Sequence, residues 1–188
     1  MRTLILQGSP RKEGNTATLV RQFVKGLRDG GSDDVREFVL NDMNIRPCQG
    51  CLTCVTSCQH ECIIEDDMQQ IYREFIASNT IVFATPVYWW HMSAQLKTCM
   101  DRMDSLAAGG HFRNKNMVLI TTYGFEDPDG VDLMVKMFGA IAKWANMRIS
   151  VLRYCSGPPR EGKHVSSVKE KLDEAYKLGR SFAGGMDI

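Results

Sequence analysis

The sequence predicts an α/β protein: a three-layer α/β/α sandwich built around a five-stranded parallel sheet. Short apolar, β-branched segments alternate along the chain with longer amphipathic segments, which is typical of parallel strands joined by helical crossovers. The chain has 188 residues, of which 44% are hydrophobic and 24% charged. This size and composition suit one compact unit with a substantial core. We therefore expect residues 1–188 to form a single domain.

Each expected strand is a short apolar run, and the runs recur at intervals that leave room for a helix. The five runs cover residues 4–7, 35–40, 81–85, 118–121 and 149–152. Five apolar faces with helical spacing follow them, at residues 19–27, 68–76, 96–103, 134–145 and 168–176. Five strand and helix units of this kind give the doubly wound sandwich.

Three local signals mark where helices begin or end. Gly30 and Gly31 follow the first helical face as a stop signal. Asp66 and Gln69 have the spacing of a capping box at the start of the second helix. Ser93 is placed to cap the third.

The charge pattern and the N-terminus restrict the partners and the location of the protein. The net charge is +1 and the Lys and Arg residues are scattered, so we expect neither nucleic acid nor an anionic membrane as a partner. The chain enters its first strand run without the apolar stretch of a signal peptide, and no run approaches the ~20 apolar residues that span a bilayer. We expect a cytoplasmic protein.

The turn after the first strand has the composition of a phosphate site. Ser9, Arg11, Asn15 and Thr16 lie in a glycine-containing turn that leads into the first helix, where free backbone N–H groups and the helix dipole favour an anion. The turn lacks both the dinucleotide fingerprint and the P-loop ending, which suits a mononucleotide such as FMN. The alternative is an ordinary turn in which Asn15 or Thr16 only caps the helix.

Two further strand ends carry polar and aromatic residues that suit a flavin ring. The third strand run is followed by Pro86, Val87, Tyr88 and Trp89, and the fourth by Thr122, Tyr123 and Gly124. Ligands of open α/β sheets bind beyond the carboxyl ends of the strands, where these residues should meet the first turn. The alternative is that the aromatic side chains only cover an edge of the core.

Together these segments resemble the NADPH-dependent FMN reductase family of flavodoxin-like proteins. The resemblance extends to Asp66-Asp67-Met68, to residues 92–97 and to Asp101-Arg102. It implies a sheet in the order 2-1-3-4-5 and FMN bound with its phosphate at Ser9, Arg11, Asn15 and Thr16. It places the ring near Pro86, Val87, Tyr88 and Trp89 and near Thr122, Tyr123 and Gly124. It also implies a homodimer or homotetramer with the flavin close to the subunit interface.

A segment of about residues 41–65 is too long for an ordinary loop of such a fold, and it holds five of the seven cysteines. Cys48, Cys51, Cys54 and Cys58 reproduce the spacing of a bacterial ferredoxin run. With this segment the chain resembles the iron-sulfur flavoproteins, and this resemblance favours Cys62 over Cys58 as the fourth ligand of a [4Fe-4S] cluster. Free thiols, or a zinc site at Cys48, Cys51, Cys58 and Cys62, are the alternatives.

The function that follows is an FMN-dependent oxidoreductase. Electrons would pass from NAD(P)H or a reduced carrier to a quinone, flavin, nitro or azo compound or to a redox protein, with the cluster as a one-electron relay. Because the flavin carries the chemistry, no catalytic side chain is expected. The alternatives are a non-enzymatic carrier of the flavodoxin type, which the near-neutral charge disfavours, and a metal-binding regulatory module without flavin.

Overall fold

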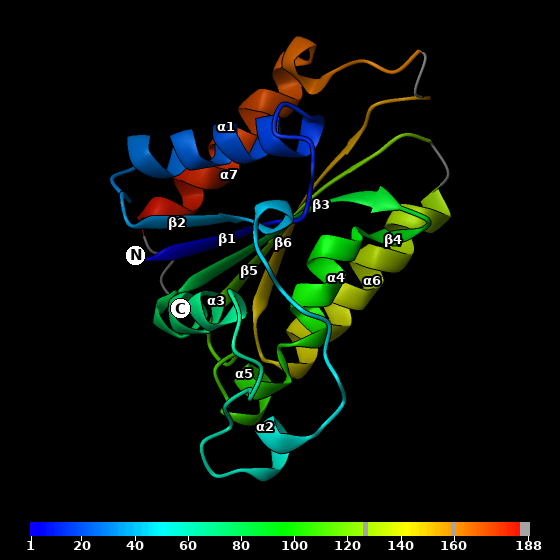
Figure 1. Cartoon of the computed structure of the whole chain (residues 1–188). Coiled ribbons are helices and arrows are strands. Elements are labelled where there is room, and N and C mark those ends of the chain that lie inside the picture. Colours follow the sequence, from blue (N-terminus) through cyan, green and yellow to red (C-terminus); the bar gives the residue numbers. More distant parts are fainter. Residues whose placement is uncertain (126–127, 159–160, 185–188) are drawn as a thin grey trace.

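A twisted parallel sheet lies between two layers of helices in the computed structural model of the chain (Figure 1). The structure describes residues 1–125, 128–158 and 161–184, without the side chains at 128 and 129. No helix in these ranges is long and apolar enough to cross a membrane.

Five parallel strands form the sheet, and their order is the expected one. Along the sheet they are β2 (Val35–Val39), β1 (Thr3–Gln7), β3 (Thr80–Tyr88), β5 (Asn116–Tyr123) and β6 (Arg148–Cys155). Every neighbouring pair is parallel. Because β4 lies outside this row, β5 and β6 are the fourth and fifth parallel strands along the chain. This confirms the predicted flavodoxin-like α/β/α sandwich with the order 2-1-3-4-5.

The third strand is longer than predicted and continues into a hairpin. β3 includes Pro86 and runs to Tyr88, and the two-residue strand β4 (His91–Met92) pairs with it antiparallel. The expectation of a loop from Pro86 onward was therefore wrong. Proline lacks the amide donor of a ladder, but Pro86 keeps its register with Thr122 of β5.

The helices are divided between the two faces of the sheet. α1 (Asn15–Asp29) and α7 (Lys169–Ala183) cover one face, and α3 (Met68–Ala77), α4 (Ala94–Asp101) and α6 (Pro128–Trp144) cover the other (Figure 1). Shorter helices, not predicted, lie between them: η1 (Leu40–Asp42), α2 (Thr53–Thr56), α5 (Asp104–Ala108) and η2 (Val165–Ser167).

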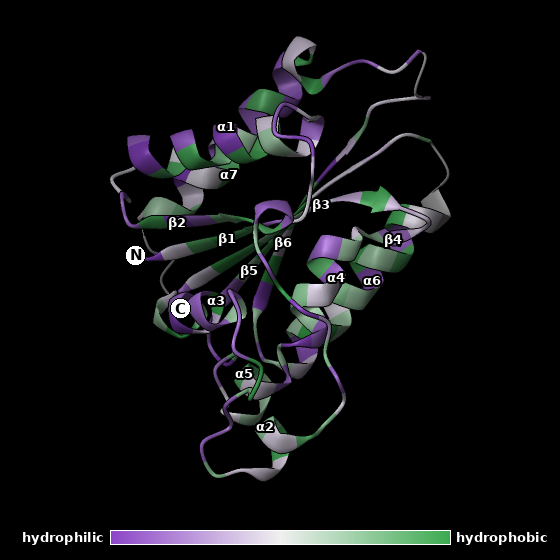
Figure 2. Cartoon of the chain, viewed as in Figure 1, coloured by the Kyte–Doolittle hydropathy of each residue, from purple (hydrophilic) through white to green (hydrophobic). Residues whose placement is uncertain are grey.

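Alternate side chains of the strands enter the two halves of the core. Leu4 and Leu6 of β1 pack with the layer of α3, α4 and α6, whereas Ile5 packs with α1 and α7. All three are fully buried, as expected for a strand covered on both faces. Figure 2 shows the same pattern, with hydrophobic residues along the strands and polar residues on the outer sides of α1 and α7.

Two glycines bring α1 and α7 into very close contact. A Cβ atom at Gly26 would lie 2.1 Å from the carbonyl oxygen of Tyr176, and one at Gly179 would lie 2.0 Å from that of Phe23. Because only glycine fits at these two positions, the backbones of the two helices pack directly against each other. This contact fixes α1, whose N-terminus faces the carboxyl ends of the strands.

Two of the three helix signals are confirmed and one is wrong. Gly30 is the C-cap of α1, and the Ser93 hydroxyl accepts a hydrogen bond from the backbone of Leu96 at the start of α4. The capping box does not form, because the residue before α3 is Asp67. The Gln69 amide instead donates to carbonyl groups of the cysteine segment.

Candidate functional site

The N-terminus of α1 lacks a side-chain cap. The residue before the helix is Gly14, and the first two helical side chains are engaged elsewhere. Asn15 Oδ1 accepts from the backbone of Val165 at 2.8 Å, and Thr16 Oγ1 lies 2.8 Å from Thr122 Oγ1. The alternative in which Asn15 or Thr16 only caps the helix is therefore wrong. The uncapped N–H groups and the helix dipole leave a place for an anion.

The turn before this helix is held tightly against α4. Ser93 Oγ donates to the carbonyl of Gly8 at 2.7 Å. A Cβ atom at Gly8 would lie only 2.6 Å from Ser93 Oγ. The next residue, Ser9, is 3% exposed and its hydroxyl oxygen accepts from the Arg11 backbone at 3.2 Å. The Arg11 side chain itself is exposed, so it can reach over an anion bound at the turn.

A cavity of about 570 Å³ opens at this turn, beyond the carboxyl ends of β1, β3, β5 and β6. The structure brings together there all the predicted flavin-binding residues except Trp89: Ser9, Arg11, Asn15, Thr16, Pro86, Val87, Tyr88, Thr122, Tyr123 and Gly124. Its volume is within the usual range of small-molecule sites. Hydroxyl groups, an uncapped helix terminus and aromatic walls fit the phosphate, ribityl and ring parts of FMN.

The loop after β6 completes the cavity and was missed by the sequence analysis. Ser156, Gly157, Lys163 and His164 line it, and the backbone of Lys163 donates to the carbonyl of Ser156 at 2.7 Å. The sequence could have indicated this loop, because the fifth strand of the predicted parallel sheet ends at the same edge as the other strands.

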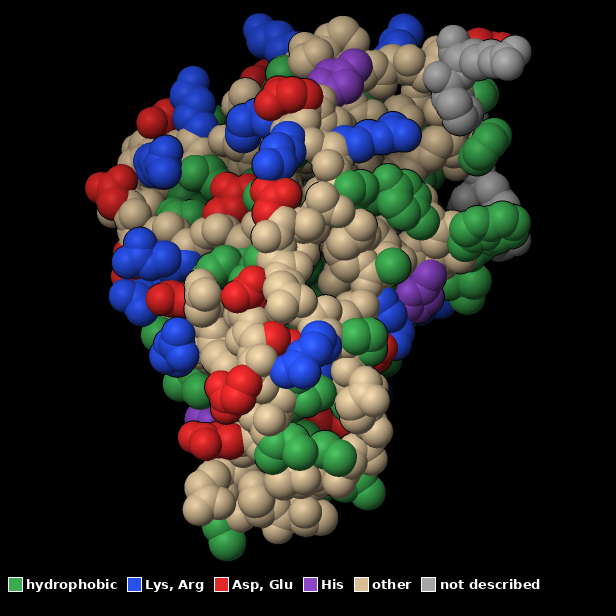
Figure 3. Space-filling view, in the orientation of Figure 1, with side chains coloured by type: hydrophobic (Ala, Val, Ile, Leu, Met, Phe, Trp, Pro, Cys, Tyr) green, Lys and Arg blue, Asp and Glu red, His purple; other side chains and the backbone are tan. Residues whose placement is uncertain are grey.

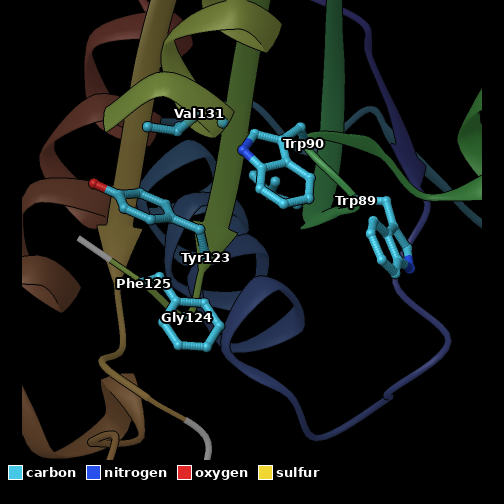
Figure 4. A pocket seen from close by; sticks show the side chains of 8 residues that line it. Trp89, Trp90, Tyr123, Gly124, Phe125 and Val131 are labelled. Carbon is cyan, nitrogen blue, oxygen red and sulfur yellow. The ribbon is translucent and has the colours of Figure 1, made fainter. Parts of the chain in front are cut away.

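An apolar pocket of about 460 Å³ adjoins the cavity and shares Val87, Tyr123, Gly124 and Phe125 with it. Figure 4 shows Trp90 facing Tyr123 and Phe125 across this pocket, whereas Trp89 lies to one side. Burial raises the pKa of Tyr123 above its ordinary value. A tyrosine phenol is protonated at neutral pH, so Tyr123 can donate a hydrogen bond.

The two tryptophans do not cover an edge of the core. Trp89 is 89% exposed and Trp90 51% exposed, and both adopt positive φ angles, 47° and 59°. Residues other than glycine rarely adopt positive φ angles, and those that do are often found at functional sites. Figure 3 shows hydrophobic side chains gathered at the upper right of the molecule, over the β3–β4 hairpin. This surface is available to a ligand or a partner.

The cysteine segment lies at the other end of the molecule, around α2 (Figure 1). A small cavity of about 30 Å³ is lined by Cys48, Cys51, Cys54 and Cys62, but not by Cys58. Thus the set favoured from the sequence shares one cavity. The set of the zinc alternative, which includes Cys58, does not share it.

The surroundings favour the thiolate at two of these sulfur atoms and disfavour it at a third. The backbone of Gly50 donates to Cys48 Sγ at 3.4 Å, and hydrogen bonds from Thr53 lower the pKa of Cys51, whereas burial raises the pKa of Cys54. Four cysteines in one cavity fit an iron-sulfur cluster in number and chemistry. Within the described ranges, however, no group of three or more His, Cys, Asp or Glu side chains is arranged to hold a metal ion, so the sulfur atoms must move closer to bind one.

Fold and site together define a flavodoxin-like, mononucleotide-binding protein. The model of the family described as NADPH-dependent FMN reductase matches residues 1–150, and the chain belongs to this family. This confirms the resemblance inferred from the sequence.

Among curated relatives, the chain is similar to iron-sulfur flavoproteins of archaea. It is 38% identical over 116 residues to one from Methanocaldococcus jannaschii, a match that covers 61% of this chain and 58% of the relative. It is 33% identical over 119 residues to one from Methanosarcina thermophila, covering 63% and 58%. The chain thus spans less than two thirds of the length of these relatives.

Solved structures with the same fold include flavoenzymes. An NAD(P)H:quinone oxidoreductase from Methanothermobacter marburgensis superposes with a TM-score of 0.78 at 20% identity, covering 100% of this chain and 98% of that one. An FMN-dependent NADH-azoreductase from Bacillus anthracis, solved with FMN, gives a TM-score of 0.71 at 16% identity, covering 97% and 100%. At these identities the likeness establishes the fold.

Proposed function

We propose that the chain is an FMN-dependent oxidoreductase that passes electrons from NAD(P)H or a reduced carrier to a small acceptor or a redox protein. The observation that carries this proposal is the cavity at the strand ends. It combines an uncapped helix N-terminus with aromatic and hydroxyl-bearing strand ends, which are the parts that a flavin mononucleotide needs.

The phosphate of FMN would lie at the start of α1. Ser9, Asn15 and Thr16 offer short polar side chains there, and Arg11 offers a mobile positive charge. Thr16 has a second task, because its hydroxyl also contacts Thr122 at 2.8 Å. This contact ties the phosphate end of the cavity to β5, where the ring would lie.

The flavin ring would lie between the β3 and β5 ends. Pro86, Val87 and Tyr88 form one wall, and Thr122, Tyr123 and Gly124 form the other, while Trp89 lines the adjoining apolar pocket. When bound, FMN supplies the capacity to accept two electrons together and to release them one or two at a time. The protein orients the ring, restricts water and offers the Tyr123 phenol as a hydrogen-bond donor.

The adjoining apolar pocket is our proposed acceptor site. Its aromatic lining, with Trp90 opposite Phe125 (Figure 4), suits a flat aromatic molecule. Quinones, free flavins, and nitro or azo compounds share this shape.

Cys48, Cys51, Cys54 and Cys62 would hold a [4Fe-4S] cluster that acts as a one-electron relay. The names of the curated relatives and the common cavity of these cysteines support this proposal. Because the cysteine segment and the flavin cavity lie at opposite ends of the molecule (Figure 1), the relay would operate between subunits. A homodimer or homotetramer in the cytoplasm is therefore part of the proposal.

Enzyme and carrier can be distinguished by turnover. Purified protein loaded with FMN is mixed without oxygen with NADPH or NADH and a quinone, and nicotinamide oxidation is followed by absorbance. We expect steady-state oxidation that requires FMN. If neither nucleotide is oxidised with quinone, nitro, azo or flavin acceptors, while a reduced ferredoxin reduces the bound flavin, the protein is the non-enzymatic carrier.

A further inference from the structure

A buried ion pair lies at the base of the cysteine segment. The Arg102 side chain is 0% exposed and that of Asp66 is 1% exposed, with Nη1 of the arginine 2.8 Å from Oδ2 of the aspartate. The second guanidinium nitrogen, Nη2, lies 3.3 Å from Oδ1, so the pair is bidentate. A buried pair of this kind is weak support for stability by itself, because desolvation offsets much of the attraction. Its position therefore calls for another explanation.

The same arginine joins the two arms of the cysteine segment. Nη1 donates to the carbonyl of Arg46 at 2.8 Å, and Nη2 donates to the carbonyl of Ile64 at 3.2 Å. Arg46 precedes Cys48 by two residues, and Ile64 follows Cys62 by two. One guanidinium thus holds both ends of the segment.

The fifth N–H of this guanidinium is unused. Nε of Arg102 is buried and has no hydrogen-bond partner among the described residues, although charged donors are rarely left unpaired. Arg102 lines the small cavity together with the four cysteines. Burial would lower its pKa, but the hydrogen bond to Asp66 and the nearby Tyr72 and Cys62 outweigh burial and raise it. Because Arg102 and Cys62 line the same cavity, a group held by the cysteines would lie next to a charged side chain that has one unused donor.

Acidic groups also border this cavity. Asp101 and Asp104 line it, and the Lys97 side chain forms an ion pair with Asp101. Asp104 contributes to the raised pKa of Cys54, after burial. Arg102 is the basic residue in the lining of this cavity, so it is the group that favours added negative charge on the sulfur atoms.

We propose that Arg102 is a positioning residue for the group held by the cysteines, and that its free N–H stabilises the reduced form of that group. It closes the base of the segment through the Arg46 and Ile64 carbonyls and brings a positive charge with an unused donor to the cavity that the four cysteines share. Hydrogen bonds to sulfur and local charge are the factors that set cluster potentials. This inference rests on the proposed [4Fe-4S] cluster.

The test is an EPR-monitored redox titration of the flavin- and iron-loaded protein. Arg102→Gln removes the donor and its charge, so we expect the midpoint potential of the cluster to fall. At a fixed potential the ratio of reduced to oxidised cluster should fall at least tenfold, which is about 59 mV for a one-electron couple. Asp66→Asn keeps Arg102 but removes its counter-charge, so the potential should shift in the opposite direction. The flavin potential of the same sample is the internal reference and should move less than that of the cluster, because neither Arg102 nor Asp66 lines the flavin cavity.

Gln69→Ala is the comparison for a purely structural role. It removes two hydrogen bonds to the carbonyls of Cys62 and Ile64 without changing charge, so the cluster potential should shift much less than in Arg102→Gln. Shifts of the same sign in Arg102→Gln and Asp66→Asn, or no shift in either, would overturn the proposal. If Arg102→Gln loses its iron, Arg102→Lys and Asp66→Asn decide the question.

Failure of the cluster itself is recognised separately. A wild-type protein with flavin but no iron contradicts the cluster and with it the stabilisation of its reduced form. The positioning role is then tested by hydrogen exchange of the iron-free protein. Arg102→Gln should speed exchange at the amides of Asn44, Arg46 and Asp67, which are hydrogen-bonded at the base of the segment. Unchanged exchange there would overturn this role as well.

Discussion

The flavin cavity and the cysteine segment differ in how their ligand groups are held. The cavity is formed by the ends of parallel strands and by a helix that Gly26 and Gly179 lock in place. The cysteines lie on a mostly exposed segment attached at its base by one buried ion pair. The first site is pre-formed by the fold, whereas the second would need the proposed cluster to draw its donors together. Because the two sites share no residue, the contents of each can be changed separately.

The largest effect is expected from the cysteines themselves. Cys51→Ser or Cys62→Ser should reduce the iron content from about four per chain, as for a cubane cluster, to nearly none, because a lost thiolate opens the cluster. Flavin content should not change. Iron and flavin are measured on the same anaerobic sample.

Cys58→Ser is the matched control, because Cys58 belongs to the same segment but lies outside the common cavity. It should retain both iron and flavin. Iron lost from Cys58→Ser but kept by Cys62→Ser would reverse the assignment of the fourth ligand.

A smaller, complementary effect is expected in the flavin cavity. Thr16→Val keeps the shape of the side chain but removes a hydroxyl that faces both Thr122 and the proposed phosphate. The loss of a hydrogen bond to a charged group is worth about 1.5–3 kcal/mol, so the Kd for FMN should rise roughly ten- to hundredfold. Titration of FMN fluorescence measures it.

Thr18→Val tests the same change one half-turn along the helix, where the hydroxyl contacts Arg21 rather than the cavity. Its FMN affinity should match the wild type. Equal weakening by both variants would mean that the loss comes from α1 stability and not from the phosphate site.

The apolar pocket should show a moderate, acceptor-specific effect. Trp90→Ala removes the indole that faces Tyr123 and Phe125 (Figure 4). Aromatic contacts are worth about 0.5–1.5 kcal/mol, so KM for a quinone should rise roughly two- to tenfold. The KM for NADPH and the FMN content should be unchanged.

Trp89→Ala, which removes the more exposed indole, should affect quinone KM less. Both tryptophans line the pocket, so a larger effect of Trp89 than of Trp90 would place the acceptor at the more exposed end of the pocket and contradict its contact with the Trp90 indole.

The smallest effect concerns pH and the base of the cysteine segment. Burial alone would raise the pKa of Asp66, but hydrogen bonds from Arg102 and from the backbone of Arg46 and Met68 lower it below the usual value. Such a carboxylate stabilises the fold above its unfolded pKa of about 3.9, and this contribution is lost as the pH falls through the folded pKa. Urea unfolding from pH 7 to 2.5 should show the stability gap between wild type and Asp66→Asn closing in acid.

Asp101→Asn, at an exposed ion pair, provides the comparison and should differ little from wild type at any pH. A gap for Asp66→Asn that is constant over the whole range would contradict the lowered pKa.

Features that depend on local pattern were readable from the sequence. The apolar runs predicted the number and positions of the parallel strands, because fully buried parallel strands are continuous apolar segments, and the family resemblance predicted their order. Ser9 and Thr16 could be placed at the helix N-terminus beside the cavity, because they lie in a strand-to-helix turn, and their role in binding a phosphate stays a prediction. The predicted third strand was too short, because a proline is typical of a loop. Its place in β3 depends on pairing with Thr122 of β5, which the local sequence does not show.

Features that depend on distant contacts could not be read in this way. The pairing of Arg102 with Asp66 joins residues 36 positions apart. The capping-box pattern at Asp66 and Gln69 was misleading, because the Gln69 amide donates to carbonyl groups of the cysteine segment and Asp66 accepts from Arg102 as well as from the backbone of Met68. Lys163 reaches the cavity only through the course of the loop after β6. Contacts of this kind can be identified only once the three-dimensional structure is known.

The central claim is that this chain binds FMN at the strand ends and a separate iron-sulfur group at the cysteines. The most direct test is an absorption spectrum of protein purified without oxygen, with flavin and iron quantified on the same sample. We predict flavin bands with a broad iron-sulfur shoulder, and about one FMN and four irons per chain. Flavin without iron would contradict the cluster. A protein that neither contains FMN nor binds it when added would contradict the account as a whole.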